Sequence, residues 1–269
     1  MKKYVLIPDS FKGTLSSADI CRIAAEEIRR LEPEAEIDAI PVADGGEGTA
    51  DAFLTAVGGQ RIDAPCTGLL GEPRTGHYAL LPDGTAVVEM AAAAGLPLVG
   101  DARDPEKTTT YGVGELMAHA LTHGAKRLVL GLGGSATNDG GCGAAAALGA
   151  VFYDERGRAF VPAGGTLSRI ARVQTEALHR TLGGIPVTVM CDIDNPLCGP
   201  EGAAAVFGPR RARMPPWWPA WTRGCVIWRR CWPATSTYRC CRCPAAGPQA
   251  VSVRVRLPFS VVPCVWALR

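Results

Sequence analysis

The stretch Gly131–Gly143, GLGGSATNDGGCG, is the part of this 269-residue chain from which the fold can be worked out. It follows an apolar run, Arg127–Leu130, and leads into an alanine-rich run, Ala144–Leu148. A strand, a glycine-rich loop and a helix start, in that order, present backbone N–H groups to an anion. Glycines also let a ligand approach the backbone closely. The stretch therefore predicts an anion-binding loop; the alternative is a tight connection without a ligand.

The loop also carries side chains that can bind a polar ligand. Ser135, Thr137 and Asn138 are neutral hydrogen-bonding groups. Asp139 adds a carboxylate that could bind a metal or accept a hydroxyl proton. The loop is not a Walker A phosphate loop, because no Gly-Lys-Ser/Thr follows it. The candidate substrate- or phosphate-binding residues are Gly133, Gly134, Ser135, Thr137, Asn138 and Asp139.

Composition favours a soluble globular protein, with 47% hydrophobic and 20% charged residues. No apolar run reaches the length of a membrane span, and the first apolar run stops at Pro8, too early for a signal peptide. The five cysteines before Pro209 are scattered singly, as in proteins with reduced thiols. We expect a cytoplasmic protein without a membrane partner.

Charge divides the chain near Pro209. Residues 1–208 hold 17 basic and all 26 acidic residues, a net charge of −9, whereas residues 209–269 hold 11 arginines and no acidic residue. All six tryptophans and six of the 11 cysteines also lie in the second part. A change of character this abrupt marks a boundary.

The first part of the chain begins with two strand–loop–helix units. Tyr4–Pro8 predicts a buried strand, and Ile37–Val42 predicts a second strand that Pro41 weakens. Ser16 is the predicted N-cap of a helix that runs to Leu31, with Asp19 in capping-box position, and Thr49–Val57 predicts a short helix. This repetition is typical of a parallel, doubly wound sheet, whose ligand loops lie at the carboxyl ends of the strands.

Polar residues follow both predicted strands. Lys12 could neutralise a phosphate or carboxylate, and Asp9 could accept a hydroxyl proton, unless this segment is only a solvated turn. Asp44 and Glu47 lie on a glycine turn and suit Mg²⁺, unless they are simply acidic residues at a helix start.

From about Arg61 the pattern changes. Tyr78–Leu81 and Thr85–Met90 flank an Asp-Gly turn, which predicts a hairpin and a second domain with antiparallel strands. Gly112–His123 predicts a helix, and Ile185–Met190 predicts a strand. That strand opens into acidic and amide residues, of which Asp192 and Asp194 point to opposite sides if the chain stays extended, so that one of them faces a site.

Four segments taken together resemble the signature segments of the bacterial glycerate kinase family. They are PDSFKGTLS at 8–16, ADGGEGT at 43–49, GGSATNDGG at 133–141 and CDIDNPLCGPEGAAAVFGP at 191–209. The resemblance covers residues 2–209 in family order, and four such motifs together are specific.

The resemblance implies ATP-dependent phosphorylation of D-glycerate to 2-phosphoglycerate or 3-phosphoglycerate, with Mg²⁺. It implies an α/β fold with a Rossmann-like parallel domain and an inserted mixed α/β domain, here assigned to residues 1–75 and 76–208. Asp9, Lys12 and Asp192 become the expected catalytic residues, and Ser10 and Asn195 join the expected substrate-binding set. Asp44 and Glu47 become the expected Mg²⁺ ligands. Oligomeric state stays open.

The resemblance stops after Pro209, although the family pattern continues and returns to complete the first domain. Residues 209–269 are rich in Trp, Cys, Arg and Pro, which predicts a disordered tail and a missing C-terminal part of the fold. Pro244–Trp266 admits a codon choice that, read one base earlier, gives a glycine-rich segment resembling that of the family. We therefore expect a frameshift. The alternatives are a catalytically inactive fragment, or a binding protein whose basic tail contacts nucleic acid. For a glycerate kinase we expect no nucleic-acid partner.

Overall fold

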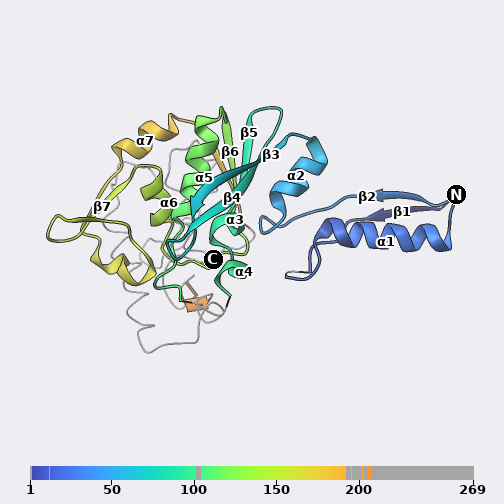
Figure 1. The fold of residues 1–269 in the computed structure, drawn as a ribbon, viewed down its shortest axis with the longest axis horizontal. Coiled ribbons are helices and arrows are strands. Elements are labelled where there is room, and N and C mark those ends of the chain that lie inside the picture. The colour runs from blue at the N-terminus through green and yellow to red at the C-terminus, as the bar shows by residue number, and fades with distance from the viewer. Residues whose placement is uncertain are drawn as a thin grey trace, which may run out of the picture.

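The computed structural model describes residues 2–11, 13–100, 104–191, 195, 201–202 and 205–206. Figure 1 shows the helices and strands. The strands are β1 Lys3–Leu6, β2 Glu36–Ala39, β3 Gln60–Thr67, β4 Pro73–Leu80, β5 Thr85–Glu89, β6 Arg127–Gly131, β7 Val151–Tyr153, β8 Ala159–Phe160, β9 Arg172–Gln174 and β10 Val187–Met190. The helices are α1 Ser17–Leu31, α2 Thr49–Val57, α3 Ala91–Ala94, α4 Leu96–Val99, α5 Tyr111–Thr122, α6 Cys142–Ala147, the 3₁₀ helix η1 Gly164–Arg169 and α7 Glu176–Leu182.

A five-stranded mixed sheet in the order β10-β6-β5-β4-β3 forms the centre of the molecule. Strands β5, β6 and β10 are parallel, whereas β3, β4 and β5 pair antiparallel. The predicted hairpin is confirmed as β4 and β5, and Gly84 of its Asp-Gly turn has φ of 83°. Because β5, β6 and β10 run the same way, their carboxyl ends lie at one edge of the sheet.

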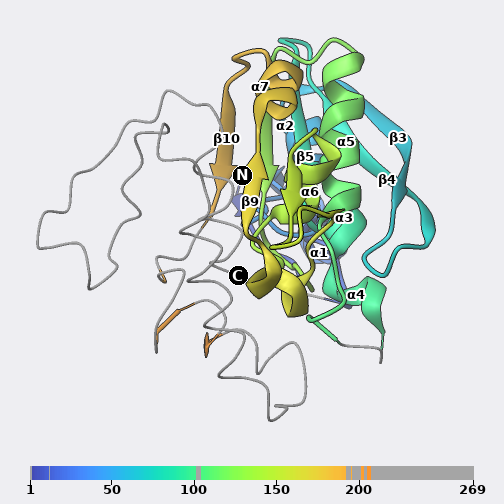
Figure 2. The same ribbon diagram turned by 90° about the vertical axis from the view of Figure 1, so that its left-hand side faces the viewer.

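Helices cover both faces of this sheet (Figure 2). On one face, Ala79 and Val87 pack against Ala50 and partly buried residues of α2. On the other face, Tyr78 and Val88 join the larger apolar core that includes α5 and α6. Alternate residues of a strand point to opposite faces, so these strands are buried on both sides. The α/β class predicted from the sequence is confirmed.

The first 40 residues form a separate unit of β1, β2 and α1, here called the arm, which extends from the rest of the fold in Figure 1. Strands β1 and β2 are parallel, as predicted, but β1 is not the buried strand that the sequence predicts, because Val5 is 53% exposed. The side chain of Ser16 caps α1 by accepting a hydrogen bond from the Asp19 N–H at 3.1 Å, also as predicted. Strand β2 ends at Ala39 rather than at Val42, because Pro41 has no N–H to extend the ladder.

The remaining strands form a small antiparallel sheet in the order β8-β7-β9. Strand β3 precedes residue 75, where the sequence placed the domain boundary, and pairs with β4 along its whole length. The boundary itself stays a prediction. Within the described ranges, none of the helices has the length and apolar character that crossing a bilayer requires.

Candidate active site

Two of the predicted glycine motifs meet at the carboxyl edge of β5, β6 and β10. The Gly133 N–H donates to the carbonyl of Gly45 at 2.8 Å, and the Leu132 N–H donates to the carbonyl of Met190 at 3.4 Å. A Cβ at position 133 would overlap the backbone of Gly46, so the close contact between the two loops needs glycine there. The loop after β6, the loop before α2 and the end of β10 therefore form one site.

Two hydroxyl groups of the β6 loop bind each other. The Ser135 and Thr137 side-chain oxygens lie 2.9 Å apart, and the Ser135 Oγ also accepts the Thr137 N–H at 3.1 Å. Both residues are buried. In this structure these groups hold the shape of the loop, and their contact with a substrate stays a prediction.

Asp139 uses both carboxylate oxygens inside the protein. Its Oδ1 accepts the Gly141 N–H at 3.0 Å, and its Oδ2 accepts the Thr110 N–H and hydroxyl, both at 2.8 Å, and the Gly143 N–H at 3.1 Å. Burial raises the pKa of this carboxyl, and the hydrogen bonds oppose that shift. Asp139 thus connects the loop to the starts of α5 and α6; its expected contact with a ligand stays a prediction.

Asn138 differs from its neighbours in the loop. The residue is only 2% exposed, and its Nδ2 has no hydrogen-bond partner in the described structure. An unpaired buried donor costs about 1–3 kcal/mol, so it is rare without a reason. Asn138 therefore has a buried donor left for an acceptor atom of a ligand.

The two carboxylates predicted to bind Mg²⁺ lie on the loop before α2. Asp44 is half-buried, and its Oδ1 accepts the Gly46 N–H at 3.0 Å; Glu47 is exposed. No group of three or more His, Cys, Asp or Glu residues that could hold a metal occurs in the part of the chain that the structure describes. Two carboxylates fit Mg²⁺ only where water and substrate oxygens supply the other ligands, which is common for this ion.

Glu89 is a residue of the site that the sequence analysis missed. It closes β5, is 2% exposed, and accepts the Ala50 N–H at 2.5 Å and the Gly48 N–H at 3.3 Å. Burial raises the pKa of Glu89 to about 7, although both hydrogen bonds lower it. The available signal was a lone carboxylate at the end of an apolar strand, TAVVE.

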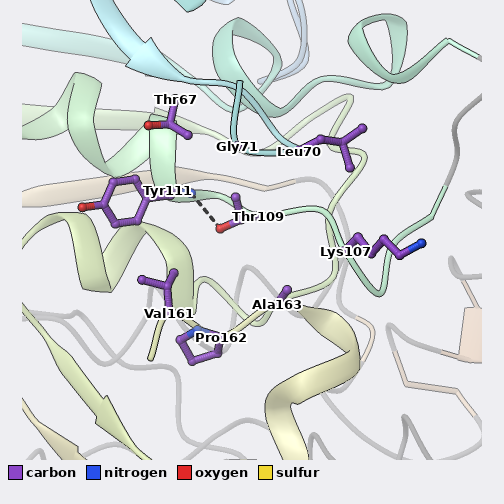
Figure 3. Close-up of a pocket in the computed structure, with 9 residues that line it drawn as sticks. All are labelled: Thr67, Leu70, Gly71, Lys107, Thr109, Tyr111, Val161, Pro162 and Ala163. Atoms are coloured by element: carbon purple, nitrogen blue, oxygen red, sulfur yellow. Dashed lines mark hydrogen bonds between the residues drawn. The ribbon is translucent and has the colours of Figure 1, made fainter. Parts of the chain in front are cut away.

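An open cleft of about 340 Å³ lies beside the start of α5 (Figure 3). Thr109 and Tyr111, which flank the Asp139 partner Thr110, form part of its wall. Lys107 also lines the cleft, but its ammonium group pairs with Asp104 at 3.0 Å. No sequence motif pointed to this cleft. The remaining lining residues are Thr67, Leu70, Gly71, Val161, Pro162 and Ala163.

The residues that form this geometry match a known protein family. The model of the Glycerate kinase family matches residues 4–216, which is most of the chain. This chain belongs to the glycerate kinase family. All of the loops just described fall inside the matched residues.

The relatives of this glycerate kinase family member are longer than the part that matches. This chain is 46% identical over 211 residues to the glycerate kinase of Bacillus subtilis (strain 168). It is 42% identical over 211 residues to the glycerate 2-kinase of Escherichia coli (strain K12). Each match covers 78% of this chain and 55% of the relative, so the chain spans about half the length of these curated relatives. A crystal structure described as glycerate kinase 2 from Salmonella typhimurium LT2 matches with a TM-score of 0.74 and 39% identity, over 85% of this chain and 62% of that chain.

The other predicted glycerate kinase residues lie in two places. Asp9 and Ser10 follow β1 on the arm, where the Asp9 Oδ1 accepts the Ser10 N–H at 2.7 Å; the described interactions do not join either residue to the glycine loop. Asn195 lies after β10 and donates from Nδ2 to the carbonyl of Glu201 at 3.0 Å. Lys12 and Asp192 lie outside the described residues.

Proposed function

We propose that this chain derives from an enzyme that transfers the γ-phosphoryl group of ATP to a hydroxyl of D-glycerate. The observation that carries the proposal is membership of a family whose relatives are named glycerate kinase and glycerate 2-kinase, at 46% and 42% identity. The meeting of two glycine loops at the carboxyl edge of parallel strands supports it, because phosphoryl transfer depends mainly on positioning and charge.

The proposed roles follow from the chemistry of the transfer. The glycerate hydroxyl oxygen forms a bond to the γ-phosphorus, the bond from that phosphorus to the β–γ bridging oxygen breaks, and ADP leaves. Asp9 or Asp192 accepts the hydroxyl proton, and Lys12 offsets the negative charge. The loop from Gly133 and the unpaired donor of Asn138 bind the phosphate or the substrate carboxylate. The product is 2-phosphoglycerate, with 3-phosphoglycerate as the alternative.

Asp44 and Glu47 are the proposed ligands of Mg²⁺, which supplies charge neutralisation for the phosphates when it is bound. Both carboxylates lie on the loop that touches Gly133 through Gly45 and Gly46. The half-buried position of Asp44 and the exposed position of Glu47 leave Glu47 open to a hydrated ion.

A second candidate is a catalytically inactive member of the family. The short span of the relatives that this chain covers supports this candidate. Asp9 and Ser10 lie on the arm, and the chain spans 55% of the Bacillus subtilis and Escherichia coli enzymes. We place both candidates in the cytoplasm, in keeping with the buried free thiols of Cys21 and Cys66.

A coupled assay of ADP release from ATP and D-glycerate, with Mg²⁺ present, separates the two candidates. Phosphorylation of glycerate by the full chain supports the kinase, and Lys12→Ala or Asp192→Ala should then lower turnover by about 10²-fold or more. Near-normal turnover of both variants would remove these residues from the site. Absence of product, with retained ligand binding, identifies the inactive family member.

The basic tail receives a separate proposal. We infer that the chain is read in a shifted frame from about residue 210, because the composition changes near Pro209 and the family match does not extend beyond residue 216. Resequencing of the gene around codon 210 tests this directly. A clean single frame, without family sequence downstream, would contradict the shift and favour a binding protein with a basic tail that contacts nucleic acid.

A further inference from the structure

The amino end of α2 has no side-chain cap from its own segment. Its N-cap residue is Gly48, which has φ of 88° and no side chain to accept a hydrogen bond. The first backbone N–H groups of a helix need partners from outside the helix. Glu89, from the neighbouring strand β5, supplies them by accepting the Ala50 and Gly48 N–H groups. A carboxylate at this end of a helix also interacts favourably with the helix dipole.

The loop that carries Asp44 and Glu47 is thus held on two sides. On one side the Gly133 N–H binds the Gly45 carbonyl at 2.8 Å, and on the other the Glu89 carboxylate binds the Gly48 N–H. Only two residues separate Gly45 from Gly48, and one of them is Glu47. The position of the Glu47 backbone is therefore set by the ends of β5 and β6.

We propose that Glu89 is a positioning residue that fixes the loop bearing Asp44 and Glu47 at the carboxyl edge of the sheet. This inference rests on the proposed function, in which that loop binds Mg²⁺ and the phosphates. Glu89 itself touches backbone N–H groups, so it acts through the loop.

Glu115, on a helix that packs against the same sheet, provides a matched control. Its carboxylate also accepts one backbone N–H, that of Thr67, at 2.5 Å. It lies on α5, which packs on the opposite face of the sheet from α2. Glu89→Gln and Glu115→Gln therefore make the same chemical change, but only the first affects the α2 loop.

Amide hydrogen exchange of the full chain tests the contact directly. In Glu89→Gln, one N–H of the pair faces an amide NH₂ in place of an oxygen, so the Gly48 or Ala50 amide should exchange at least about tenfold faster, while amides of β6 report any change in global opening. In Glu115→Gln the effect should fall on Thr67 alone. Unchanged exchange at both Gly48 and Ala50 would overturn the proposal.

Calorimetric titration of the full chain with MgATP in the presence of D-glycerate separates this inference from the proposed function. With intact binding in the unsubstituted chain, Glu89→Gln should raise the Kd about tenfold and Glu115→Gln should leave it unchanged. Equal Kd values for the unsubstituted chain and Glu89→Gln would contradict a positioning role. No binding by the unsubstituted chain would contradict the proposed function, and the exchange experiment would still decide whether Glu89 holds the loop.

Discussion

The Glu89 carboxyl makes the free energy of unfolding depend on pH. Its pKa rises from 4.5 to about 7 because burial disfavours the charged form, and the carboxylates of Asp51 and Glu47 add to that shift. A raised folded-state pKa means that the folded protein binds this proton more tightly than the unfolded chain does. The contribution of Glu89 to the free energy of unfolding is therefore fully present below about pH 4.5 and is lost as the pH rises through about 7. The shift corresponds to about 3 kcal/mol. The free energy of unfolding of the unsubstituted chain, relative to Glu89→Gln, should fall by this amount between pH 4.5 and 8.

Urea unfolding at a series of pH values measures that difference. Titrating groups far from Glu89 contribute equally to both proteins, so subtraction of the two curves isolates Glu89 together with its coupling to Asp51 and Glu47. Parallel curves from pH 4.5 to 8 would mean that the carboxyl does not titrate near neutrality. The same subtraction with Glu115→Gln serves as the reference.

Asp139 carries a second residue-level prediction. Its two oxygens accept four hydrogen bonds, three of them at Oδ2, so an amide at this position would turn an NH₂ group toward N–H donors. Asp139→Asn should therefore lower the free energy of unfolding by about 2–4 kcal/mol, measured by urea unfolding at pH 7. Glu47→Gln, at an exposed position of the adjoining loop, should change it by less than about 0.5 kcal/mol. Equal effects would argue against the bracing role of Asp139.

These residues also show what sequence could and could not predict about the site. The cap that Ser16 makes with Asp19 spans three positions, and local spacing predicted it. The bonds from Glu89 to Gly48 and Ala50 span 41 and 39 positions, and those from Asp139 to Thr110 span 29. Such pairs depend on strand order, which no local pattern contains. The sequence therefore predicted the glycine loop, but not that the Asp139 carboxylate connects this loop to the starts of α5 and α6.

The same limit holds for whole elements. The Asp-Gly turn and the helical spacing of α1 and α5 are local signals, and the structure confirms those elements. Strand β3 carries Pro65 and alternates irregularly, and it forms because β4 pairs with it along eight residues. The parallel pairing of β6 with both β5 and β10, which creates the site edge, joins strands far apart in the chain.

The arm should be the least protected part of the described fold. Val5, Ile7 and Ile40, on or next to its two-stranded sheet, are 53%, 57% and 48% exposed, whereas all five residues of β5 are buried. Protection against hydrogen exchange follows burial and packing. The amides of β1 and β2 should exchange roughly 100-fold faster than those of β5 and β6. Similar rates in the two sheets would show that the arm is as stable as the central fold.

At the scale of the whole molecule, stability is concentrated in the middle of the chain. The apolar clusters of the described residues draw all their buried members from Ala50 to Val187, and no described element lies beyond residue 206. A chain that ends at Pro209 keeps this core and loses 11 arginines, so its net charge falls from +2 to −9. Its free energy of unfolding at moderate salt should stay within about 1 kcal/mol of the full chain, because distant charges are screened. Thermal and urea unfolding of both chains measure this. A much larger loss in the shortened chain would mean that residues 210–269 pack on the core, and would contradict their interpretation as a tail read in the wrong frame.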